Sequence, residues 1–172
     1  SEAGGMFVVP FGDQGYLVYP EGEVRIAETG REPDITTQIL VLHYLITADG
    51  HPPADRWIAF RELPEGLIYD AAFQRRTGAR LAAAFGWDVE AFVRAAKALG
   101  GERLTYGDAS FLFRLFPRVN LAVVLHLADE EFPAEANVLF DAAAGHYLPT
   151  EDLAVLGGML AGRLIKAKAL PR

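Results

Sequence analysis

The 172-residue chain is 51% hydrophobic, carries a net charge of −7 and contains no cysteine. Without cysteine, the chain cannot build a disulfide, an Fe–S cluster or a cysteine nucleophile. The acidic balance argues against nucleic-acid binding, which ordinarily uses a basic face. No apolar run reaches the roughly 18 residues that a membrane span requires, so we expect a soluble, cytoplasmic protein.

Length and hydrophobic content predict one domain over residues 1–172. The opening Ser-Glu-Ala-Gly-Gly is not a signal peptide, and we expect residues 1–5 to be disordered or a cloning remnant. Basic residues gather mid-chain, and we interpret them as the solvent-exposed face of two helices: Arg75, Arg76, Arg80, Arg94, Lys97 and Arg103.

The first elements are short apolar runs separated by turn residues. They predict an antiparallel meander with strands over 6–11, 16–19 and 24–27. Asp34 is a candidate N-cap for a helix over 35–48, which is apolar nearly all round. A helix without a polar face is usually buried on several sides, so we expect this helix to be the spine of the fold.

The rest of the chain alternates helices and strands. We expect a strand over 57–60, helices over 69–85 and 88–99, a hairpin over 111–116 and 121–127, and a helix over 150–168. Segment 136–140 fits either a strand or a helical turn, and we favour the strand. The predicted fold class is therefore α+β, with an antiparallel sheet of hairpins packed around a buried apolar helix and further helices on the outside.

Candidate ligand-binding residues start from His43, which lies within the predicted buried helix. A buried imidazole is either a structural hydrogen-bonding group or a ligand facing an internal cavity. The tripeptide His43-Tyr44-Leu45 recurs as His146-Tyr147-Leu148, and an aromatic and charged block follows the helix. The candidate set is Gln38, His43, Tyr44, Trp57, Arg61, His146 and Tyr147.

The segment after the second hairpin is acidic, with Asp129, Glu130, Glu131 and Glu135 within seven residues. Hard cations prefer such oxygen clusters, but the spacing does not fit an EF-hand loop. A solvent-exposed acidic loop is the plainer interpretation. The alternative is a metal site formed by Glu130, Glu131 and Asp141.

Several blocks, in order over about residues 6–165, carry a family resemblance. They are Gln38-Ile39-Leu40 with His43-Tyr44-Leu45, Trp57-Ile58-Ala59-Phe60-Arg61-Glu62-Leu63-Pro64, Leu99-Gly100-Gly101, Gly107-Asp108, Asp129-Glu130-Glu131-Phe132-Pro133-Ala134-Glu135-Ala136, Val138-Leu139-Phe140-Asp141 and His146-Tyr147-Leu148-Pro149-Thr150-Glu151-Asp152-Leu153. On these blocks the chain resembles the DUF3786 family. The resemblance implies a prokaryotic protein of unknown function, common in anaerobes, with no assigned catalytic residues. Some family members add an Fe–S-type segment, which this cysteine-free chain lacks.

Three functional hypotheses follow. The first is a ligand-binding module for a hydrophobic cofactor in anaerobic metabolism, for which the family's setting suggests a tetrapyrrole or corrinoid. It predicts an internal cavity reaching His43. The second is an accessory protein-interaction domain, which predicts an exposed apolar patch. The third is a hydrolase-like or metal-dependent enzyme that uses segment 129–141 and His146.

Overall fold

The computed structural model describes residues 5–169, so residues 1–4 of the opening segment lie outside the described residues. The helices are α1 (Ile35–Thr47), α2 (Gly66–Arg76), α3 (Gly78–Phe85), α4 (Val89–Ala98) and α5 (Thr150–Lys168), with short 3-10 turns η1 (Phe60–Glu62) and η2 (Ala144–His146). The strands are β1 (Phe7–Phe11), β2 (Gln14–Val18), β3 (Val24–Ile26), β4 (Trp57–Ala59), β5 (Glu102–Leu104), β6 (Ala109–Phe116), β7 (Val119–His126) and β8 (Glu135–Asp141). None of the helices within residues 5–169 combines the length and the hydropathy needed to cross a bilayer.

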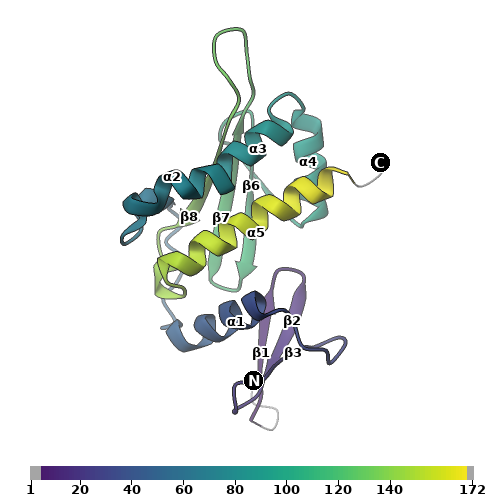
Figure 1. Ribbon diagram of the computed structural model, residues 1–172, viewed down its shortest axis with the longest axis vertical. Coiled ribbons are helices and arrows are strands. Elements are labelled where there is room, and N and C mark those ends of the chain that lie inside the picture. The colour runs from purple at the N-terminus through teal and green to yellow at the C-terminus, as the bar shows by residue number, and fades with distance from the viewer. Residues whose placement is uncertain (1–4, 170–172) are drawn as a thin grey trace.

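The strands form two antiparallel sheets, which confirms the α+β class (Figure 1). The predicted meander is the small sheet, in the order β1-β2-β3. The predicted second hairpin, β6–β7, lies in the large sheet of order β4-β8-β7-β6-β5, and segment 136–140 forms β8 as expected. The two sheets are joined where the N–H of Gly12 donates to the carbonyl of Leu115 over 2.7 Å.

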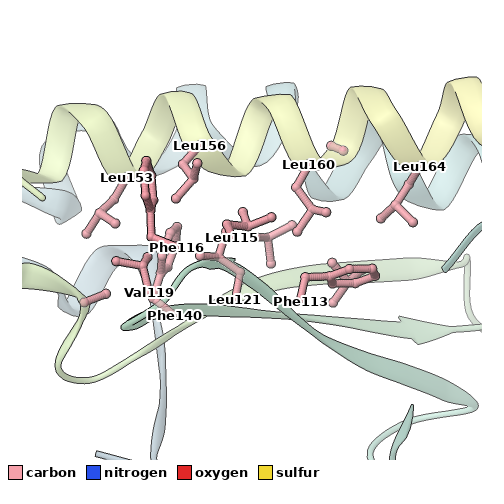
Figure 2. Close-up of a cluster of buried hydrophobic side chains, with 14 of the residues drawn as sticks. Phe113, Leu115, Phe116, Val119, Leu121, Phe140, Leu153, Leu156, Leu160 and Leu164 are labelled. Carbon is pink, nitrogen blue, oxygen red and sulfur yellow. The ribbon is translucent and has the colours of Figure 1, made fainter. Parts of the chain in front are cut away.

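Helix α5 forms the centre of the hydrophobic core. Helices α2, α3 and α5 lie over one face of the large sheet (Figure 1). Leucines of α5 at spacings of three and four residues make one stripe that faces the sheet. Figure 2 shows this stripe above aromatic and aliphatic side chains of β6, β7 and β8, namely Leu153, Leu156, Leu160 and Leu164 above Phe113, Leu121 and Phe140.

Helix α1 is not the buried spine that its composition predicts. It packs at the side of the molecule through Thr37, Leu40, Val41 and Tyr44, while its opposite face remains in solvent. An all-round apolar helix carries no information about which of its faces is covered. The prediction for this segment was therefore wrong, and the 150–168 helix takes the central position.

The predicted helix over 69–85 is two helices, because α2 ends at Arg76 and α3 begins at Gly78. The Thr77 hydroxyl donates to the carbonyl of Phe73, and Thr77 leaves the helical conformation. A Cβ on Gly78 would lie 2.3 Å from the carbonyl oxygen of Ala136. The break thus lets the backbone at Gly78 approach β8 closely. This contact joins segments far apart in the chain, so the sequence around Gly78 does not predict it.

Two neighbouring positions on α5 test the role of its leucine stripe. Leu156 is fully buried and Val155 is 42% exposed. We expect Leu156→Ala to lower the free energy of unfolding by about 2–5 kcal/mol, because it removes a buried side chain and leaves a cavity. Val155→Ala should change it by no more than about 0.5 kcal/mol. Urea unfolding measures both, and equal losses would contradict the assignment of α5 as the core helix.

Candidate functional site

Two seven-residue segments with the same pattern meet in space. Residues 43–49 and 146–152 both read His-Tyr-Leu-x-Thr-x-Asp. The first segment lies at the end of α1 and the second runs from η2 into the first turn of α5. The tripeptide echo in the sequence is therefore part of a longer one, and the longer pattern is the signal that could have identified the whole site.

Each histidine pairs with the aspartate of the other segment. Nδ1 of His43 lies 2.5 Å from Oδ2 of Asp152, and Nδ1 of His146 lies 2.6 Å from Oδ2 of Asp49. Between the pairs, the rings of Tyr44 and Tyr147 stack with centroids 5.4 Å apart. The two segments thus exchange equivalent contacts, although one ends a helix and the other begins one.

Burial separates the two pairs. The Asp152 side chain is largely covered, whereas that of Asp49 is half-exposed. Asp152 also lies in the first turn of α5, where the helix dipole favours a carboxylate. Hydrogen bonds from His146 and then from the N–H of His51 hold the pKa of Asp49 below its ordinary value.

Contacts around the tyrosines fix the loop after α1. The Tyr147 hydroxyl donates to the carbonyl of His51. The His51 ring stacks on the His146 ring, with the two ring centroids 4.0 Å apart. Tyr44 also stacks on Phe116 of the large sheet, and burial raises the pKa of its phenol. The site therefore links α1, the following loop, α5 and the sheet.

In chemical terms, the arrangement holds two imidazoles by Nδ1 and leaves Nε2 of each outside the pair. A carboxylate at Nδ1 is the usual way to orient a histidine that accepts a proton or binds a metal through Nε2. No group of three or more histidine, aspartate or glutamate side chains within residues 5–169 is arranged to hold a metal ion. The geometry supports proton exchange and structural pairing.

Four of the seven predicted ligand-binding residues meet at this site, namely His43, Tyr44, His146 and Tyr147. The other three have contacts elsewhere. Gln38 donates to the carbonyl of Pro33, and Arg61 pairs with Asp70 at 3.3 Å. Trp57 lies on the edge strand β4.

The predicted metal-binding residues do not converge. Both carboxylate oxygens of Asp141 accept hydrogen bonds from backbone N–H groups, those of Ala54, Asp55 and Ala143, over 2.8–2.9 Å. Glu130 and Glu131 are exposed on the β7–β8 connection, which projects beyond the helices (Figure 1). Asp141 therefore holds the 52–56 loop against the sheet, a long-range role that sequence spacing does not reveal.

Five of the surface clefts formed by the described residues have linings that contain neither His43 nor Tyr44. His146 lines a cleft of about 430 Å³ together with Arg56 and Glu62. The largest of these five has a volume of about 560 Å³ and lies beside α5, near Arg163.

A double-mutant cycle tests the crossed pairing. We expect His43→Gln and Asp152→Asn to show a coupling free energy of about 1 kcal/mol at neutral pH. Either single variant removes the charge-assisted hydrogen bond, so the second substitution in the double variant removes no further bond. The more exposed pair, tested with His146→Gln and Asp49→Asn, should couple less strongly. Urea unfolding of the four variants and the two double variants measures both cycles. Additive losses for the first pair would contradict the geometry.

Comparison with known proteins places this fold in a family. The model of the DUF3786 domain of unknown function matches residues 1–163, which is nearly the whole chain. No curated protein and no solved structure matches it. The chain therefore belongs to the DUF3786 family.

Proposed function

We propose that this protein is an accessory protein-interaction domain, and that α1 is the surface on which it docks a helix of a partner protein. The observation that carries the proposal is the solvent-facing side of α1. Ile35 and Ile46 are 68% and 79% exposed, and Ile39 is also exposed. Three isoleucines on one exposed helix face form an apolar patch of the kind that marks interaction sites.

The spacing of this face suits a helix. Ile35, Ile39, Leu42 and Ile46 follow each other at intervals of four, three and four residues. This is the spacing of a coiled-coil seam, and it spans about 16 Å of helix. We call these four residues the α1 stripe. The three isoleucines of the stripe lie opposite the face through which α1 packs on the body and are exposed, whereas Leu42 is partly buried and contacts the edge of the core.

Charges at both ends of the stripe indicate the chemistry of the partner. Helix α1 contains no lysine, arginine, aspartate or glutamate. Glu32 and Asp34 outnumber Arg31 before it. Asp49, which is half-exposed in its pair with His146, follows it. A second copy would bring like charges together in either orientation, and the chain is already at −7. The best complement is an apolar helix flanked by lysine or arginine on a different protein.

The two other hypotheses have less support. The tetrapyrrole or corrinoid hypothesis required a cavity reaching His43, and His43 lies outside the linings of the five clefts. The hydrolase-like form of the enzyme hypothesis retains His146 in a cleft beside Arg56 and Glu62. Its metal-dependent form lacks a group of metal-binding side chains within the described residues. The cysteine-free composition suits a reducing compartment, so we propose a cytoplasmic setting, and the family resemblance is the basis for proposing a prokaryotic source.

Two synthetic helices of about three heptads test the proposal. Both carry leucines at the same four-three-four spacing, one with lysine and arginine at its ends and the other with glutamate there. We expect the basic peptide to bind at least about tenfold more tightly than the acidic one, with a salt-dependent difference. Fluorescence anisotropy measures both affinities.

Matched variants locate the binding surface. Ile46→Glu should weaken binding of the basic peptide at least about tenfold, since it places a charge in an apolar contact. Ile68→Glu on α2 is the control, because Ile68 is 77% exposed but lies outside the stripe. Equal effects of the two variants, or a dimer in solution that Ile46→Glu dissociates, would overturn the proposal.

A further inference from the structure

We infer that the cleft beside Arg163 binds a small amphipathic anion, with a carboxylate or phosphate head and a short apolar body. This cleft is separate from the α1 stripe and from the paired histidines. Its lining comes from the β1–β2 turn, the end of α4, β5, β6 and α5, and consists of Gly12, Asp13, Lys97, Ala98, Leu99, Gly100, Glu102, Phe113, Arg114, Leu115, Leu160 and Arg163.

The size and lining of the cleft suit a ligand with an apolar body. Its volume of about 560 Å³ lies within the usual range of small-molecule sites. Phe113, Leu115 and Leu160 are core residues, so they offer an apolar wall backed by the packed interior. The Gly12–Leu115 hydrogen bond holds the turn and β6 together, which gives the cleft a defined shape in the absence of ligand.

The charge of the lining selects an anion. Lys97, Arg114 and Arg163 contribute three cationic side chains, against two carboxylates from Asp13 and Glu102. The cleft is therefore locally positive on a chain whose net charge is −7. Such a reversal concentrates small anions, because like-charged surroundings exclude them elsewhere on the surface.

Arg163 is the residue best placed to hold the head group. Its guanidinium lies over the ring of Phe11, with Cζ 5.7 Å from the centroid, and the side chain is half-buried. Within residues 5–169 it forms no salt bridge with a carboxylate. A guanidinium presents a planar fork that matches carboxylate and phosphate oxygens.

Gly12 contributes space for this arrangement. A Cβ at position 12 would lie 2.9 Å from Nη1 of Arg163. The residue also has a φ of +63°, which favours glycine in the turn. The turn therefore admits the guanidinium at the edge of the cleft.

Isothermal titration with four probes tests the inference on the unaltered protein: octanoate, octyl phosphate, octanol and inorganic phosphate. We expect at least one of the two amphipathic anions to bind, with octanol and inorganic phosphate each at least about tenfold weaker. The anion with the higher affinity, octanoate or octyl phosphate, identifies the preferred head group. Either order of the two affinities supports the inference. Octanol binding as tightly as octanoate, or no binding of either anion, would overturn it.

Variants place the ligand. Arg163→Gln should weaken the tighter probe at least about tenfold, while Arg163→Lys keeps the charge and should lose less. Arg94→Gln is the control, because Arg94 is an exposed arginine of α4 that lines none of the five clefts. Full retention of affinity in Arg163→Gln contradicts the inference, and so does loss in Ile46→Glu, which would place the probe on the α1 stripe.

Discussion

The packing of α5 across the large sheet is the contact on which the other features depend. Its leucine stripe is buried along the length of the helix, from Leu153 to Leu164. Gly157 lets the ring of Phe73 approach, since a Cβ there would lie 2.8 Å from that ring. Because α5 is held along its whole length, it presents Asp152 at its first turn and Arg163 near its end in fixed positions. One helix thus supports both the paired histidines and the proposed anion cleft.

The crossed histidine–aspartate pairs determine how α1 is displayed. His43 ties the side of α1 to the first turn of α5, and Tyr44 inserts between Phe116 and Tyr147. These contacts fix the rotation of α1 about its own axis, so that the isoleucines of the α1 stripe face solvent instead of the core. In this account the crossed histidine–aspartate pairs serve as a structural clamp, and the surface that the clamp orients carries the proposed interaction.

The sequence was a good guide wherever the determining interactions are local. Turn residues located the hairpins, and the capping residue Asp34 located the start of α1, which the structure confirms through its hydrogen bond to the N–H of Thr37. Sequence-based prediction failed where contacts between distant segments determine the structure. The paired side chains lie 109 and 97 residues apart, and the repeated pattern marks the two segments without showing that each histidine pairs with the aspartate of the other. The uniform apolar character of 35–48 likewise concealed which face of that helix is free.

Site-specific photo-crosslinking in cells that make this protein tests the central claim, that the α1 stripe docks a helix of another protein. A benzophenone amino acid would replace Ile46, or Ile68 as the comparison position of similar exposure. The account predicts a cross-link from position 46, and not from position 68, to an apolar helix flanked by lysine or arginine on a different protein. A cross-link from position 46 to a second copy of this chain, or the same products from both positions, would contradict it.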